Sequence, residues 1–321
     1  MQIFDSGKVY NFMKMRWAFF ILSLAIFIGS IGYMFVKGLN YGIDFSGGTL
    51  IQIKYDRPAP LGEIRQKLSG TFEGVSVTEF GSSDEVIVRY LSSSDTLSED
   101  PGVVVSTLLK ETGNFEIRRV DIVGPKVGDE LRQKGVMAIC VSLALILIYI
   151  AFRFEWRFAL AAILGEIHDV LIVVGLIAVL RLQVNLDTLA ALLTILGYSL
   201  NDTIVIFDRI REDVAKSKST DINRVVNEAV SATLSRTLMT SLSTLFVVLI
   251  LFFWGGDMIH DFSLIMLAGV IIGCYSSVFI CAPMLGWFGF NVNAYRKFLA
   301  EKEAKRREKA QMRAMYEKGQ V

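Results

Sequence analysis

Six long apolar stretches determine what this chain can fold into. They occupy residues 17–36, 135–152, 158–180, 188–207, 237–256 and 262–290. The chain has 33 Lys and Arg and 32 Asp and Glu, and only Glu166, Asp169 and Asp202 lie inside these stretches. A membrane-spanning helix needs about 20 consecutive apolar residues, so the pattern predicts six transmembrane helices. It excludes a single soluble domain, and also an outer-membrane barrel, whose strands would be about 10 residues long and alternate in polarity.

The distribution of Lys and Arg predicts the orientation. These residues are frequent in residues 1–16, 153–157, 208–236 and 291–321, whereas the turns between spans three and four and between spans five and six contain only Arg181. Because basic segments are retained on the cytoplasmic side, we expect both termini and the segment 208–236 to be cytoplasmic. The first apolar stretch is expected to be a retained signal anchor, since it is longer than the core of a cleaved signal peptide. Residues 37–134 then form one extracytoplasmic domain.

Alternating apolar and polar residues predict the fold of this outer domain. Strands are expected at 50–55, 74–80, 85–90 and 115–123, and helices at 61–68 and 103–112, with a Ser-rich stretch from 92 to 100. The order β-α-β-β-α-β is typical of a ferredoxin-like α+β domain. The three cysteines all lie in apolar stretches, so the outer domain has none. We expect it to bind or pack, because nothing in it indicates catalysis.

Asp202 is the most informative charge inside an apolar stretch. An ionisable side chain at the centre of a spanning helix costs about 2.5 to 3.5 kcal/mol on insertion scales, which favours a functional role. Tyr198 and Ser199 precede it by four and three residues, on the same face, where they can hydrogen-bond the carboxyl. Burial favours the neutral form of a carboxyl, so Asp202 is predicted to take up and release a proton. The alternative is an acid that only holds helices together.

Arg236 precedes the fifth apolar stretch and is followed by Thr240, Ser243 and Thr244 at helical spacing. An arginine at this place is commonly an anchor that reaches the lipid headgroups. The hydroxyl stripe below it offers a second interpretation, in which this polar face reaches Asp202. Both interpretations stay open on the sequence alone.

Glu166, His168 and Asp169 lie near the middle of the third apolar stretch. Glu166 and Asp169 share a helix face, and His168 is expected to project elsewhere. The other histidine, His260, lies in an outer turn, so converging metal ligands are not expected. Motifs for nucleotide hydrolysis, serine hydrolysis or zinc proteolysis are absent from the sequence, and we expect neither an enzyme nor a bound cofactor.

Three further segments carry weaker predictions. Asp221 is expected to cap a helix that lies along the membrane surface as far as Leu234. Gly269 and Gly273 predict close helix packing in the last span. The tail from Tyr295 is expected to be a solvated charged helix, with anionic lipid or ribosomal RNA as the alternatives.

Several motifs resemble those of the SecD/SecF family. The segment from Tyr41 to Thr49 is similar to the family's G-x-D-F-x-G-G signature and supplies Asp44, Phe45, Gly47 and Gly48. Residues 152–157 are similar to its second inner turn, and His168 with Asp169 to its third helix. The fourth-helix motif of the SecF type is matched by a set that includes Gly197, Asn201, Asp202, Asp208 and Arg209, and Arg236-Thr237 follows it.

The resemblance implies one half of an RND-type membrane core, which pairs with SecD in the bacterial inner membrane to give twelve helices. It implies association with the SecYEG channel, YajC and YidC, contact with unfolded exported polypeptides, and use of the proton motive force after the ATP-driven push by SecA. Asp202 would be the proton-relay acid and Arg236 the basic residue facing it, with Asp169, Tyr198, Ser199 and Thr240 as further coupling residues. No nucleic-acid partner is implied, and Glu166 lies outside the motif. Two alternatives remain: an RND-type small-molecule exporter subunit, and an assembly factor without a coupling role.

Overall fold

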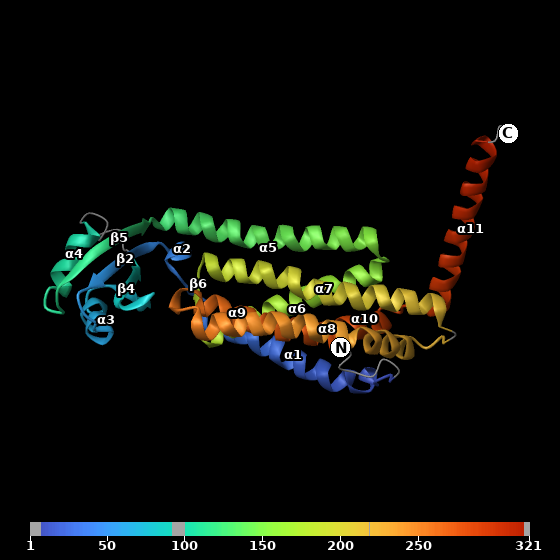
Figure 1. Ribbon diagram of the computed structural model, residues 1–321, viewed down its shortest axis with the longest axis horizontal. Coiled ribbons are helices and arrows are strands. Elements are labelled where there is room, and N and C mark those ends of the chain that lie inside the picture. Colours follow the sequence, from blue (N-terminus) through green and yellow to red (C-terminus); the bar gives the residue numbers. More distant parts are fainter. Residues whose placement is uncertain (1–7, 92–99, 218, 318–321) are drawn as a thin grey trace.

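The structure is a computed structural model that describes residues 8–91, 100–217 and 219–317. It is an elongated molecule with a small α/β domain at one end, a helical bundle in the middle and a single helix that leaves the other end (Figure 1). The predicted fold class, six membrane helices with a ferredoxin-like outer domain, is confirmed.

Six helical segments are long and apolar enough to cross a membrane. They are α1 (Phe12–Lys37), α5 (Pro125–Arg153), α6 (Trp156–Val179), α7 (Leu186–Lys216), α8 (Ile222–Trp254) and the sixth segment, Met258–Trp287. Helices α6 and α7 and the sixth segment are about half buried within the bundle, whereas few residues in the spans of α1, α5 and α8 are buried. The centre of the bundle is therefore built by α6, α7 and the last span.

The outer domain is an antiparallel sheet covered by two helices. Its strands are β2 (Gly48–Tyr55), β3 (Glu73–Phe80), β4 (Ser82–Leu91) and β5 (Phe115–Val123), arranged in the order β3-β4-β2-β5. Helices α3 (Leu61–Ser69) and α4 (Pro101–Leu109) share one core with the inner face of the sheet. That core includes Ile51 and Ile53 of β2 together with Leu68 and Leu109 of the helices, and all four are fully buried. Residues 92–99 of the predicted Ser-rich stretch lie outside the described residues.

The segment 208–236, predicted to be cytoplasmic, is mostly helical. The prediction of a separate helix along the membrane surface is wrong. Helix α7 continues to Lys216, and α8 begins at Ile222 and runs without a break through the fifth span. Asp221 does cap it, since its carboxylate accepts a hydrogen bond from the backbone N–H of Asn223 at 3.0 Å. No Gly or Pro interrupts residues 222–254, and the apolar side of the first turns packs against the bundle instead of lying on lipid.

The last span changes its helical type in the middle. Helix α9 (Asp257–Ser276) passes into a π-helical turn, Ser277–Cys281, and then into α10 (Ala282–Trp287). Pro283 has no N–H to donate to the carbonyl of Phe279, which lies inside the π turn, so the regular hydrogen-bond ladder cannot continue there. Such π turns inside α-helices are frequent at functional sites.

A tight link joins the outer domain to the bundle. The short strands β1 (Asn40–Tyr41) and β6 (Gln183–Val184) pair in parallel, and a short helix, α2 (Ile43–Ser46), follows β1. Asp44 accepts a hydrogen bond from the backbone N–H of Leu186 at 3.1 Å and so binds the first turn of α7. Gly47 has φ +77°, and a Cβ there would lie 2.8 Å from Cα of Pro125. This position needs glycine both for its backbone conformation and for its close approach to the start of α5.

Candidate functional site in the membrane bundle

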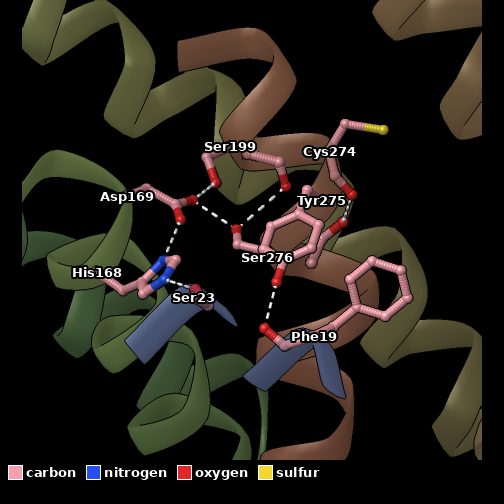
Figure 2. Close-up of polar contacts among 10 residues, drawn as sticks. Phe19, Ser23, His168, Asp169, Ser199, Cys274, Tyr275 and Ser276 are labelled. Carbon is pink, nitrogen blue, oxygen red and sulfur yellow. Dashed lines mark hydrogen bonds and ion pairs between the residues drawn. The ribbon is translucent and has the colours of Figure 1, made fainter. Parts of the chain in front are cut away.

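Asp169 of α6 is the centre of a buried hydrogen-bond network that joins four helices (Figure 2). Its Oδ1 pairs with Nδ1 of His168 at 2.8 Å, and its Oδ2 accepts hydrogen bonds from Ser199 of α7 and Ser276 of α9, both at 2.6 Å. Nε2 of His168 bonds in turn to the hydroxyl of Ser23 on α1. A neutral His168 that donates through Nδ1 accepts through Nε2, so one tautomer satisfies both contacts. Three donors therefore satisfy the fully buried carboxyl group of Asp169.

Asp202 of α7 is also buried, with 3% of its surface exposed, but it has fewer partners. Its Oδ2 accepts one hydrogen bond, from the hydroxyl of Ser241 on α8 at 3.2 Å. The charge of Arg236, also on α8, lies near enough to act on this carboxyl, although the two groups make no ion pair within 4.0 Å in the part of the chain that the structure describes. Asp202 is therefore a buried acid whose carboxyl group has one hydrogen-bond donor and no ion pair among the described residues.

The predicted partners of Asp202 lie elsewhere. Ser199 donates its hydrogen to Asp169, and the Tyr198 hydroxyl is buried without a partner among the described residues. Thr240 is exposed and donates to the carbonyl of Thr237 on its own helix at 2.9 Å. The predicted contacts of Tyr198, Ser199 and Thr240 with Asp202 are therefore not made. The residue that does contact Asp202 is Ser241. The sequence analysis did not include it, because it placed the helix face of Thr240, Ser243 and Thr244 toward Asp202.

The buried face of α8 carries Thr237 and Ser241, which are four residues apart and could have been recognised as a second polar face. The network around Asp169 also contains residues that the sequence analysis missed, Ser23 and Ser276. Both are hydroxyl residues in apolar stretches. Ser23 has only apolar neighbours in the sequence, whereas Ser276 lies between Tyr275 and Ser277, and this small polar group is the signal that the sequence offers for it.

His168 differs from expectation, and Glu166, for which no role was predicted, is deeply buried. His168 was predicted to project away from Asp169, but its ring bends back onto the neighbouring carboxylate. Glu166 is 1% exposed, and its Oε2 has no hydrogen-bond partner among the described residues. Within those residues no group of three or more His, Cys, Asp or Glu could hold a metal ion.

Two glycines bring α9 close enough to α7 to complete the network. A Cβ on Gly273 would lie 2.9 Å from Cβ of Ser199, and one on Gly269 would overlap the side chain of Ile195. The predicted close packing at these positions is confirmed. It places Ser276, three residues after Gly273, where its hydroxyl reaches Asp169. A further bond, from the hydroxyl of Tyr275 to the carbonyl of Phe19 at 2.6 Å, ties the same turn to α1 (Figure 2).

Comparison with known families identifies the chain. Residues 32–59 match the SecD/SecF GG motif, and residues 104–291 match the family described as protein export membrane protein SecD/SecF, C-terminal. The chain belongs to the SecD/SecF family.

Relatives in this family are named protein translocase subunit SecF. The one from Helicobacter pylori strain J99 is 43% identical over 323 residues, which cover 100% of both chains. The one from Vibrio alginolyticus is 43% identical over 286 residues, or 88% of this chain and 91% of the relative.

Two solved SecDF structures are similar to this chain. The Thermus thermophilus SecDF structure has a TM-score of 0.77 and 35% identity over 89% of this chain and 40% of that one. A SecDF structure in a super-membrane-facing form has a TM-score of 0.69 and 34% identity over 95% of this chain and 41% of that one. The chain thus spans about two fifths of each SecDF chain.

The remaining residues of the SecD/SecF motifs occupy two places. Those of the GG motif, Asp44, Phe45, Gly47 and Gly48, build the link between outer domain and bundle. At the other end of α7, Asp208 pairs with Arg153 at 3.4 Å, and Arg209 with Asp213 at 3.1 Å.

Gly197 and Asn201 of the fourth-helix motif lie on a face of α7 that is exposed. A Cβ on Gly197 would meet nothing within 4 Å. Arg236, Thr240 and Ser243 form a matching exposed polar face on the adjacent helix α8. Polar side chains within membrane helices are costly to leave against lipid, so these two faces are suited to contact protein.

Proposed function

We propose that this SecD/SecF family member is a subunit of the Sec protein translocase that uses the proton motive force to promote protein export across the inner membrane. The names of its relatives support the translocase role. The observation that carries the coupling role is Asp202, a buried carboxyl on a central helix with one hydroxyl partner. Isolated ionisable groups of this kind are typical of proton pathways in membrane transporters.

In this mechanism Asp202 and Arg236 attract each other while the acid is charged. Protonation removes that attraction, and α7 and α8 then shift relative to each other. One charge that crosses 100 mV releases about 2.3 kcal/mol, which is enough to bias a conformational step of a few kcal/mol. The Asp169 network meanwhile holds α1, α6, α7 and α9 together, because its bonds do not depend on Asp202.

The outer domain would move with α1 and α5, the helices that flank it in the chain. The tight link at Gly47 transmits their movement, while a polar cavity of about 540 Å³ separates part of the domain from the outer turns of the bundle. Arg65 and Arg89 line it from the outer domain, and Arg181, His260 and Asp261 from the turns. An interface that is hollowed by a mostly polar cavity opposes domain movement less than a closely packed apolar one. We propose that the domain acts on unfolded exported polypeptide.

The exposed polar faces of α7 and α8 support a heteromeric core. We propose that SecD covers them, because the SecDF chains to which this chain is similar are more than twice its length. SecYEG, YajC and YidC would assemble around the pair, after SecA has supplied the ATP-driven push. Both termini would be cytoplasmic, on the side where Lys and Arg are frequent.

The test of the coupling role is Asp202→Asn in cells that lack the native copy. Asparagine keeps the shape and accepts the hydrogen bond of Ser241, but it cannot carry a proton. We expect the part of export that a protonophore abolishes to be lost in this variant, as measured by pulse-chase maturation of an exported protein. Asp187→Asn is the matched control, because Asp187 lies exposed in the first turn of the same helix. Normal protonophore-sensitive export in Asp202→Asn would refute the relay.

The same strains separate the two alternatives. A small-molecule exporter predicts accumulation of its substrate with export unimpaired. An assembly factor predicts normal function in Asp202→Asn and a fall in the amount of assembled translocase only when the whole chain is removed. Crosslinking from Asn201→Cys tests the partner separately, and a product that contains no SecD-like protein would contradict the proposed pairing.

A further inference from the structure

Helix α11 (Val292–Glu317) leaves the bundle in a different direction from the membrane helices. It crosses the end of the bundle at a steep angle to them, so it runs broadly along the membrane surface (Figure 1). Its first turn is anchored, because Val292 and Tyr295 are buried. The Tyr295 ring lies 5.2 Å from that of Phe290, and Arg211 donates a hydrogen bond to its hydroxyl at 3.0 Å. Tyr295 therefore marks the side of α11 that faces the bundle.

Basic residues continue that side along the rest of the helix. At about 100° per residue, five cations fall within an arc of about 100°. We call them the α11 stripe: Lys302, Lys305, Arg306, Lys309 and Arg313. Lys302 and Lys309 follow Tyr295 by two and four turns of the helix, whereas Glu301, Glu303 and Glu308 lie outside the arc. Phe298 lies within the same arc and Met312 just beyond it, and these two side chains are 55% and 51% exposed.

Among the described residues the stripe has no acidic partner. In the described part of the chain none of its five cations makes an ion pair, although each lies on an exposed helix. Other charged helices of this molecule do pair their cations along one face, as Lys216 does with Glu212 and Arg224 with Glu228. Five unpaired cations on one side form a surface that attracts anions.

We propose that the α11 stripe binds the anionic phosphate headgroups of the membrane that the bundle spans. The stripe continues the side of Tyr295, and that side faces the bundle and thus the membrane. A cationic helix face with exposed Phe and Met beside it is typical of helices that lie in the lipid interface. Ribosomal RNA would not require the helix to run along the membrane, so we favour lipid. The tail is then an anchor that fixes the inner ends of α7 and α10.

The experiment compares the full-length protein in nanodiscs of phosphatidylcholine and in nanodiscs that contain phosphatidylglycerol. Hydrogen exchange of α11 is followed by mass spectrometry, with peptides of β5 as the internal reference. We expect phosphatidylglycerol to slow exchange in α11 by about tenfold. High salt should remove the effect, because it screens exposed charges.

Two double variants separate the stripe from net charge. Lys302→Glu with Lys309→Glu reverses two charges in the stripe, and Lys297→Glu with Arg307→Glu reverses two charges on other sides of α11. The first pair should abolish the lipid-dependent slowing and the second should retain it. Each variant is compared with itself in the two lipids, so a change in helix stability does not mimic the result. Equal exchange in both lipids, or equal loss in both pairs, would overturn the proposal. Slowing by added RNA, with none by phosphatidylglycerol, would assign the stripe to nucleic acid instead.

Discussion

The outer domain and the membrane bundle differ in whether their charged side chains are exposed or buried. The ion pairs described within the outer domain, such as Lys54 with Asp84 and Lys67 with Glu111, lie at its surface, and its core is apolar apart from a few hydroxyls. The bundle has the more apolar sequence, yet it buries Glu166, Asp169 and Asp202. Exposed ion pairs contribute little to stability, whereas buried acids are costly. The most deeply buried carboxyl groups of the described residues therefore lie inside the membrane bundle and not in the outer domain.

Within the bundle, Asp169 and Asp202 differ in how many hydrogen bonds their carboxyl groups accept. Asp169 accepts three hydrogen bonds from three side chains, while Asp202 accepts one. We interpret Asp169 as a structural residue that joins helices, and we propose Asp202 as the site that changes protonation. The following predictions test this difference, and the difference between bundle and outer domain.

The largest effect on stability is expected for Asp169→Ala. It leaves the side chains of His168 and Ser199 as donors without an acceptor, while Ser276 retains only the carbonyl of Gly273 at 3.2 Å. Loss of one member of such a buried charged network costs about 3 to 5 kcal/mol. Asp202→Ala should cost only about 1 kcal/mol, because one hydrogen bond is lost. Unfolding in mixed micelles measures both. Equal losses would remove the distinction between the two acids.

The link between outer domain and bundle should be sensitive to one methyl group. Gly47→Ala places a Cβ against Pro125 and forces a left-handed backbone on alanine, which together should cost roughly 3 kcal/mol. Gly81 has a similar φ, +73°, but nothing lies within 4 Å of its Cβ position. Gly81→Ala should therefore cost only about 1 kcal/mol. Thermal unfolding of the two variants tests this, and the prediction fails if their midpoints shift equally.

Smaller losses of stability are expected for alanine substitutions at Ser199 of α7 and Ser241 of α8. Ser199→Ala removes a donor to Asp169 at 2.6 Å and should cost about 2 kcal/mol, as expected for a hydrogen bond to a charged group. Ser241→Ala removes a longer bond, 3.2 Å, to Asp202 and should cost about 1 kcal/mol or less. Protonophore-sensitive export should respond in the opposite order, with Ser241→Ala affected more. An effect on export that simply follows the stability loss would contradict the assigned roles.

The smallest effect is expected at the surface of the outer domain. The hydrogen bond and charge of Lys67 hold the pKa of Glu111 below its usual value. The contribution of this pair to stability is therefore present above the pKa of an unfolded glutamate and is lost as pH falls through the lowered value. Glu111→Gln should remove a slight acid-dependent loss of stability, measured by unfolding between neutral and acidic pH. Lys67→Gln should have the same effect, and a large change in either variant would contradict the view that outer-domain charges are only surface features.

Much of the fold follows from local patterns. The apolar stretches give the six helices because their length is a property of consecutive residues, and alternation gives the four strands of the outer domain in their order along the chain. The sequence also identified Asp169 and Asp202 as exceptions, since a charge in an apolar stretch is visible without a structure. It did not show that α8 extends from Ile222 through the membrane, because an amphipathic start and an apolar continuation look like two helices.

The sequence by itself determined that the chain has six membrane-spanning helices and which acids lie inside them. Only the tertiary structure decided which hydroxyl reaches which acid: Ser199 and Ser276 to Asp169, and Ser241 to Asp202. The physical reason is that helix length depends on local hydrophobicity, whereas contacts between helices depend on their relative rotation and depth. In this protein close packing at Gly269 and Gly273 sets the position of α9 against α7, and with it the partners of Asp169.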